Sequence, residues 1–170
     1  MIMVMDATPD FDDLFGPLYR DARRVAWRLL GDRTEAEDVA AEAMIRALMA
    51  WGKVGALPYR NAWVMRVTAN VAIDSLRRRP LMVLGGAGAD EPDLSDIGEG
   101  VALGVDVRRA LAGLSRRQGE VLALRWIGGL TEDEVSRCLG VSRSSVSTHA
   151  ERGLARMRDA MGGEVGYVAS

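Results

Sequence analysis

Hydrophobic side chains recur every three or four residues along most of this chain, which is the spacing of helices that bury one face. The run over residues 11–30 shows it most fully, and the same rhythm returns over 34–51, 59–79 and 105–158. Strict alternation of polar residues with β-branched or aromatic ones, which is typical of strands, is scarce. The pattern therefore predicts an all-α protein.

Proline, glycine and capping residues predict where the helices of the first half begin and end. Pro17 is expected to kink the first helix or to mark its true start, because proline lacks the amide donor of the helical ladder. Thr34, with Glu37 three residues later, forms a capping-box pattern that predicts the start of the second helix. The buried face of that helix is expected to be Ala36, Val39, Ala40, Ala43, Ala47 and Leu48. Residues 52–58 are expected to form a loop, and Pro80 stops the third helix.

Residues 131–158 predict two short helices joined by a tight turn. Thr131 and Glu134 form another capping-box pattern at the start of the first helix. Gly140 can adopt the left-handed conformation that ends a helix, and Ser142 can cap the next one. The second helix is expected to bury Val146, Ala150, Gly153, Leu154 and Met157.

The opposite face of this second helix is small, polar and basic. It carries Arg143, Ser144, Ser147, Thr148, Glu151 and Arg152. Such a face suits a recognition helix that enters the major groove of DNA, as in helix-turn-helix proteins. An ordinary helical hairpin with a solvated face is the alternative.

Charge is segregated along the chain, although the formal net charge is only −2. Two basic islands, 60–79 and 137–158, flank a segment over 90–106 that has acidic residues and no basic one. A near-neutral total argues against a protein that attracts nucleic acid over its whole surface, since non-specific binding depends on positive charge meeting phosphate. Local basic faces are therefore the candidates for nucleic-acid contact.

Composition also predicts the domain boundaries. Residues 81–104 are rich in Gly, Asp and Glu and are expected to form a flexible acidic linker. This linker joins a first helical domain over 1–80 to a second over 105–162, and a tail over 163–170 is expected to fray. The hydrophobic fraction of 48% is ample for a core.

The second helix has an acidic face formed by Glu35, Asp38 and Glu42. Like charges at this spacing repel each other in an isolated helix by a few tenths of a kcal/mol, roughly. A solvated face is one interpretation. A docking surface for a basic partner is the other.

The third helix combines aromatic, amide and basic residues in an unusual way. The set is Tyr59, Trp63, Asn70, Asp74, Arg77, Arg78 and Arg79. Aromatic rings and arginines together suit a groove for single-stranded nucleic acid, where cations meet phosphates and rings stack on bases. Alternatively, Asn70 and Asp74 tie neighbouring helix ends together, with Asp74 paired to Arg77 or Arg78, and the arginines favour the helix C-terminus.

Nothing in the sequence predicts an enzyme, a metal or a cofactor. His149 is the only histidine and has no Cys, Asp or Glu at ligand spacing. Cys138 is the only cysteine, which excludes an internal disulfide, and it is expected to be a small core residue. The N-terminus lacks a basic region of the secretory type and no apolar run approaches membrane-spanning length. A soluble, cytoplasmic protein is therefore expected.

Three blocks of sequence follow one another along the chain: RTEAEDVAAEAMIRALMAW (33–51), AWVMRVTANVAIDSLRRRP (62–80) and LSRRQGEVLALRWIGGLTEDEVSRCLGVSRSSVSTHAERGLARMR (114–158). They resemble, in this order, regions 2.2, 2.3–2.4 and 4 of the sigma-70 family of bacterial RNA polymerase sigma factors. The chain is most similar in organisation to the small extracytoplasmic-function (ECF) group, which keeps regions 2 and 4 only.

The resemblance implies partners and roles. Core RNA polymerase and promoter DNA are the expected partners, and an anti-sigma factor is a further candidate. The acidic helix would dock on the β′ clamp helices, by motif match through Asp38 and Glu42. The third-helix set would engage the melted −10 element, with Trp63 and Asp74 in part structural. The helix-turn-helix would read the −35 element and meet the β flap, and the acidic linker would pass near the RNA exit path.

Two positions depart from the family pattern. Ser147 stands where a lysine that contacts phosphate is frequent, and Ala41 stands where a glutamine is frequent. The first departure puts the strength of −35 binding in doubt. Two other functions stay open: a stand-alone helix-turn-helix regulator that needs neither the acidic helix nor the first basic island, and a protein that occupies polymerase or a regulator without directing initiation.

Overall fold

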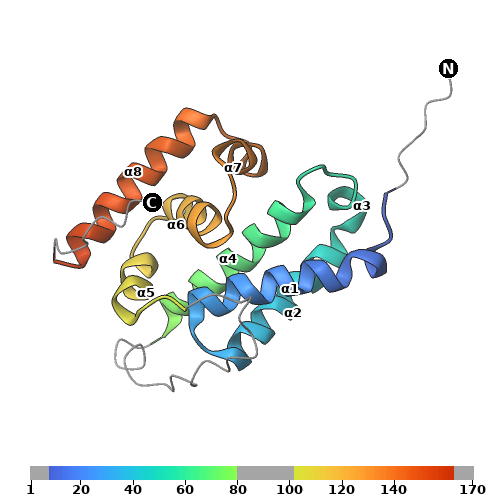
Figure 1. The fold of residues 1–170 in the computed structure, drawn as a ribbon, viewed down its shortest axis with the longest axis horizontal. Coiled ribbons are helices and arrows are strands. Elements are labelled where there is room, and N and C mark those ends of the chain that lie inside the picture. Colours follow the sequence, from blue (N-terminus) through green and yellow to red (C-terminus); the bar gives the residue numbers. More distant parts are fainter. Residues whose placement is uncertain (1–7, 80–101, 163–170) are drawn as a thin grey trace.

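The structure, a computed structural model, describes residues 8–79 and 102–162. All regular elements in these two ranges are helices, as the hydrophobic pattern predicts (Figure 1). Residues 81–101 of the predicted acidic linker and the whole predicted tail, 163–170, lie outside the described residues. The domain boundaries at 80 and 105 therefore stay predictions.

Four helices form the first half of the molecule. They are α1 (Phe11–Leu30), α2 (Arg33–Met49), the short α3 (Trp51–Val54) and α4 (Arg60–Arg78). α1, α2 and α4 pack against one another. Leu18, Ala22, Ala40 and Val64, together with Phe11, Met44 and Ala47, form an apolar cluster between them.

The second half contains the helix-turn-helix. Its elements are α5 (Val105–Ala112), α6 (Arg116–Leu122), the π-helical turn η3 (Ala123–Ile127), α7 (Glu132–Leu139) and α8 (Arg143–Ala160). α8 packs on α6 and α7, and α6 lies between α8 and α4 (Figure 1).

The capping residues predicted for the second half are confirmed. The Thr131 hydroxyl accepts from the Glu134 amide at 3.3 Å, and the Glu134 carboxylate accepts from the Thr131 amide at 2.7 Å. Gly140 ends α7 with φ 65°, in the left-handed region that only glycine adopts cheaply. Ser142 caps α8 by accepting from the Ser145 amide at 3.1 Å.

Two predictions about helix ends in the first half are wrong, and one of the two alternatives for Pro17 is excluded. The cap of α2 is Asp32, whose carboxylate accepts from the Glu35 amide at 2.8 Å, so the helix begins at Arg33 and not through a Thr34 capping box. Residues 52–58 are not all loop, because α3 occupies the first part of that segment. Pro17 does not mark the start of α1, which begins at Phe11.

Pro17 is tolerated inside α1 because it lies on the exposed side of the helix. Proline leaves the carbonyl four residues earlier, that of Asp13, without its helical donor. Asp13 is exposed as well, so water can take the place of the missing donor.

Two leucines expected in the core are largely exposed. Leu48 of α2 has 56% of its surface exposed and Leu154 of α8 has 41%. Leu154 lines a shallow apolar hollow together with Trp126 and Met157. Helical spacing identifies the apolar face of a helix but not how far its neighbours extend along it.

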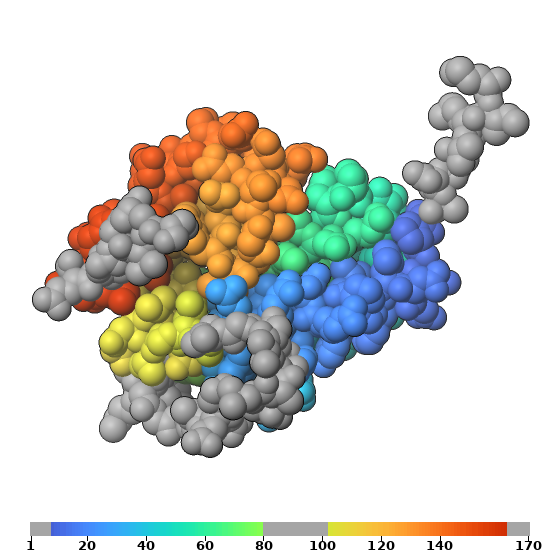
Figure 2. All heavy atoms as spheres, in the orientation of Figure 1, coloured from blue at the N-terminus to red at the C-terminus, as the bar shows by residue number. Residues whose placement is uncertain are grey.

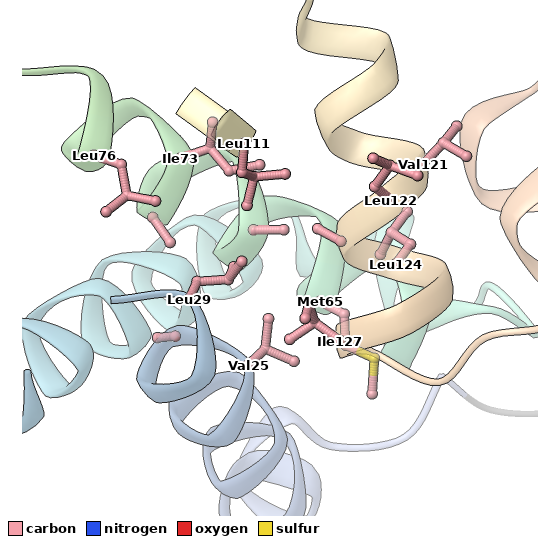
Figure 3. Packing of buried hydrophobic residues seen from close by; sticks show 14 of the residues in the cluster. Val25, Leu29, Met65, Ile73, Leu76, Leu111, Val121, Leu122, Leu124 and Ile127 are labelled. Carbon is pink, nitrogen blue, oxygen red and sulfur yellow. The ribbon is translucent and has the colours of Figure 1, made fainter. Parts of the chain in front are cut away.

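One apolar core runs through both halves. Val25, Leu29, Met65, Ile73 and Leu76 of the first half meet Leu111, Leu122, Leu124 and Ile127 of the second (Figure 3). Figure 2 shows the second half, coloured yellow to red, seated directly against the blue and green surface of the first. The relative placement of the halves, which the sequence left open, is thus set by shared apolar packing.

Truncation of a leucine in this shared core should weaken the whole fold. Leu124→Ala removes a side chain that is 1% exposed, and we expect the free energy of unfolding to fall by about 2–5 kcal/mol. Leu48→Ala, the matched control at an exposed position, should change it by less than about 0.5 kcal/mol. Urea denaturation followed by circular dichroism measures both, and equal losses would contradict the core assignment.

Candidate nucleic-acid interface

A buried carboxylate joins the two halves. Glu120 of α6 is 1% exposed. One of its carboxylate oxygens accepts from Asn70 Nδ2 at 2.8 Å and from Arg66 Nε at 3.1 Å, both on α4. The other oxygen accepts from Arg117 Nη1 at 2.8 Å. Asn70, a predicted single-strand contact, is therefore engaged by the second half.

These partners keep Glu120 ionised. Burial by itself raises the pKa of a carboxyl group, because the charged form loses its water. The hydrogen bond from Asn70, followed by the charge and hydrogen bond of Arg66 and the charge of Arg117, outweighs this effect and lowers the pKa of Glu120 below its ordinary value. The carboxylate is thus a fixed negative charge between the halves.

Arg77 also reaches across to the second half. Its Nε donates to the Ala112 carbonyl at 3.1 Å, and its Nη2 donates to the Leu114 carbonyl at 3.0 Å. Its third nitrogen pairs with Asp74 at 3.2 Å within α4. The predicted pairing of Asp74 with Arg77 is thus confirmed. Arg77 in addition links the two halves.

The other predicted single-strand residues are spread over several environments. Trp63 is half-buried and packs against the apolar cluster of α1, α2 and α4. Tyr59 is half-buried at the start of α4, and Arg78 is exposed. Arg79 pairs with Glu35, which also accepts from the Ser75 hydroxyl. The structure therefore does not gather this set into one open groove.

The acidic face of α2 is open at two of its three predicted residues. Asp38 and Glu42 are exposed, and Glu42 pairs with Arg46 at 2.8 Å. Glu35 instead holds α2 to α4 through its contact with Arg79.

An apolar patch continues this face and was missed by the sequence reasoning. Ile45 and Leu48 are each 56% exposed, and Met49 is 84% exposed. They follow Asp38 and Glu42 at three- and four-residue spacing, and that spacing is the signal that could have found them. The exposed stripe of α2 is thus acidic at one end and apolar at the other.

The predicted recognition face of α8 lies at the surface of the second half. Arg143, Ser144, Glu151 and Arg152 are exposed, while Ser147 and Thr148 are half-buried. Arg143 Nε pairs with Asp133 of α7 at 3.2 Å, where both side chains are more than half exposed. Exposed ion pairs of this kind contribute about 0–1 kcal/mol, so Arg143 can exchange Asp133 for a DNA phosphate at little cost.

The described residues contain no group of three or more His, Cys, Asp or Glu side chains that could hold a metal ion. Cys138 is buried, as expected for a core residue, and burial raises the pKa of its thiol to about 11. Among the described helices, none combines the length and apolar character needed to cross a membrane.

The helix-turn-helix with its polar outer face, attached to a second helical unit, defines a DNA-binding protein built in two parts. A family model for sigma-70 region 2 matches residues 14–80, and one for sigma-70 region 4 matches residues 110–159. The chain belongs to the sigma-70 family, in its ECF group of RNA polymerase sigma factors. The resemblance drawn from the sequence is confirmed.

Several relatives are similar over nearly the whole chain. The ECF sigma factor SigE of Mycolicibacterium smegmatis is 28% identical over 160 residues, which are 90% of this chain but 62% of the relative. SigX and SigW of Bacillus subtilis are each 27% identical, and the matches cover 83% and 88% of their lengths. A solved structure of the sigma factor RpoE from Bartonella quintana, in complex with the anti-sigma factor NepR, has the same fold, with a TM-score of 0.55 and 18% identity over 91% of this chain and 98% of that one.

The stability that Glu120 contributes should disappear in acid. Because the pKa of Glu120 is lowered in the folded chain, the unfolded chain takes up the proton first as the pH falls below about 4.5. The contribution is complete above that pH and is lost as the pH falls through the folded value. We expect Glu120→Gln to flatten the pH dependence of the unfolding free energy below pH 4.5, measured by urea titration at successive pH values. An unchanged slope would mean that Glu120 binds its proton equally well in both states.

Proposed function

We propose that this chain directs bacterial RNA polymerase to promoters: it binds the core enzyme, recognises the −35 and −10 elements and promotes melting of the DNA. The observation that carries the proposal is the pairing, in one sigma-70 chain, of an exposed helix-turn-helix reading face with an exposed acidic and apolar stripe on a separate helix. The polymerase supplies the catalysis, and the chain acts in the cytoplasm where its DNA is found. An anti-sigma factor is a candidate partner.

We assign −35 recognition to the face of α8. Arg143 and Arg152 supply positive charge, and Ser144, Ser147, Thr148 and Glu151 supply donors and acceptors for base edges and phosphates. These residues lie in the first three turns of α8, the part of a recognition helix that enters the major groove. The predicted second domain, 105–162, is the unit that carries this function.

We assign −10 recognition to the predicted first domain, 1–80, through Tyr59, Trp63, Asn70, Arg77, Arg78 and Arg79. The combination of amide, guanidinium and aromatic groups supports contact with a single strand. Asn70, Arg77 and Arg79 have protein partners in the described arrangement, so their contact with DNA requires an exchange of those partners.

We assign polymerase docking to the exposed stripe of α2. Asp38 and Glu42 offer charge to a basic helix, and Ile45, Leu48 and Met49 extend the surface with apolar area. A partner with a basic and an apolar segment fits this stripe, and the β′ clamp helices are the proposed partner. Glu35 contributes directly only if it leaves Arg79.

Reconstitution tests the function as a whole. The purified chain is mixed with bacterial core polymerase and genomic DNA fragments, and the 5′ ends of the transcripts are sequenced. We expect initiation sites that share two upstream elements. A stand-alone regulator or a merely interacting protein would give no new start sites.

Charge reversal on α2 tests the docking surface. Asp38→Lys combined with Glu42→Lys places two like charges against a basic partner, which costs several kcal/mol, so we expect affinity for core polymerase to fall by about 100-fold or more. Asp159→Lys, at an exposed site on α8, is the matched control and should bind normally. Fluorescence titration with core polymerase measures all three proteins. Full binding by the double variant would reject the assignment of Asp38 and Glu42.

A substitution at Ser147 tests the recognition helix through a gain of DNA binding, whereas the preceding test looks for a loss of polymerase binding. Ser147→Lys places a cation on the reading face, and we expect tighter binding to −35 duplex DNA, with a salt slope steeper by about 0.9 for one added phosphate contact. Ala155→Lys lies two turns further along α8 and should give a smaller change. Fluorescence anisotropy at several salt concentrations measures the slope. Equal gains from the two lysines would indicate general attraction and not a contact at Ser147.

A further inference from the structure

The residues of α4 that contact the second half lie on one stripe of the helix. Arg66, Asn70, Ile73 and Arg77 are separated by four, three and four residues, which places them on one face. Arg66 and Asn70 bind Glu120, Arg66 also donates to the Cys138 carbonyl at 3.4 Å, and Arg77 binds the Ala112 and Leu114 carbonyls. Two residues proposed to read the −10 strand, Asn70 and Arg77, are thus part of the stripe that the second half contacts; Asn70 is half-buried there, while Arg77 is exposed and engaged through its two carbonyl bonds.

Glu120 offers these side chains the chemistry that a DNA strand would offer. An amide and a guanidinium together recognise an anionic oxygen, and the Glu120 carboxylate supplies one at hydrogen-bond distance from both. Because Glu120 is 1% exposed and ionised, a second anion beside it would meet the repulsion of a like charge and would also lose its water. Glu120 and a nucleic-acid strand therefore exclude each other at this stripe.

A glycine lets α6 approach α4 this closely. A Cβ atom built on Gly119 would lie 3.3 Å from Ile73 Cδ1, and no other atom outside its own turn of helix lies within 4 Å. The space around Gly119 is therefore limited by α4 and not by the second half itself. A larger side chain at this position would oppose the contact between the halves and would leave the helix-turn-helix packing in place.

We propose that α6 masks the −10-reading stripe of α4 in the free chain, with the Glu120 carboxylate in the place of the DNA strand. Binding of the strand then requires the second half to move off α4. This inference rests on the proposed function, because it assumes that Asn70 and Arg77 read DNA. Core polymerase, which docks on the separate stripe of α2 and binds both halves, is the partner that favours the open form.

The consequence is a low apparent affinity of the free chain for single-stranded DNA. When only a fraction of the molecules is open, the apparent dissociation constant rises by the inverse of that fraction. A variant that opens the chain should therefore bind single-stranded DNA more tightly than the wild type. When both are bound to polymerase their affinities for the strand should be equal, since the wild-type chain is then open as well.

A wedge at Gly119 tests the proposal. Gly119→Gln adds a long polar side chain toward Ile73, and Gly52→Gln is the matched control because an added Cβ there meets nothing within 4 Å. The first readout is the distance between fluorophores at Asp13→Cys and Ala155→Cys, two exposed positions in opposite halves, with Cys138→Ser to remove the native thiol. The second is binding of a labelled non-template strand of the −10 region, taken from a promoter mapped in the reconstitution experiment.

We expect Gly119→Gln to lengthen the distance between the fluorophores and to raise the affinity of the free chain for the strand by about 10-fold or more, while the affinity of the polymerase complex stays unchanged. Glu120→Gln, which keeps the packing and removes the charge, should shift both readouts in the same direction by a smaller factor. Gly52→Gln should behave as the wild type.

Two results overturn the proposal separately from the function. An unchanged distance in both Gly119→Gln and Glu120→Gln shows that α6 does not control the arrangement, and a longer distance with no gain in strand binding shows that α6 does not mask the reading stripe. If instead the wild-type polymerase complex fails to bind the strand, the proposed −10 function is itself wrong.

Discussion

The burial of the Glu120 charge constrains how the two halves meet. An ionised carboxylate is stable in a protein interior only when nearly all of its hydrogen-bonding capacity is used, since an unpaired buried charge costs several kcal/mol, roughly. Arg117 of its own helix donates to one oxygen; the other accepts its hydrogen bonds from α4 and has Arg116 Nε at the longer distance of 3.7 Å. Apolar packing alone would tolerate sliding of α6 along α4. The carboxylate fixes the register, because a shift of one helical turn would take either Asn70 or Arg66 out of reach.

The same contacts explain why α4 carries polar residues on the face that meets the second half. A stripe used only for packing would be apolar throughout. This one carries three polar residues, Arg66, Asn70 and Arg77, and one apolar residue, Ile73. Arg77 donates to two carbonyls near the C-terminal end of α5, where the backbone has unpaired acceptors. Each polar group of the stripe therefore has a protein partner in the closed chain, and each keeps the donors needed for DNA. One set of side chains can serve both arrangements because a carboxylate, a carbonyl and a phosphate accept hydrogen bonds alike.

The sequence predicted what depends on neighbours along the chain and missed what depends on distant ones. The caps at Thr131 and Ser142 follow from residues three positions apart, and both are present. Asp32 and Thr34 both precede a glutamate by three residues, so two overlapping capping patterns are present at the start of α2. In the structure the cap is Asp32. The partner of Asn70 lies 50 residues away, beyond any periodicity. The sequence showed that Asn70 belongs to an unusual combination of aromatic, amide and basic residues but not that Glu120 is its partner.

The pairing of arginines within the chain also limits the positive charge that it offers to DNA. Arg66, Arg77 and Arg79 each meet a carboxylate or a carbonyl of the protein, and Arg143 meets Asp133. Positive charge that is neutralised inside the molecule releases no counterions from DNA, so the closed chain has little of the sequence-independent affinity that basic DNA-binding proteins show. For Arg66 and Arg77, whose partners lie in the second half, exchange for phosphates requires the halves to be held apart. A lower affinity of the proposed closed form than of the open form then follows from these two arginines, because their donors cannot serve the second half and a phosphate at once.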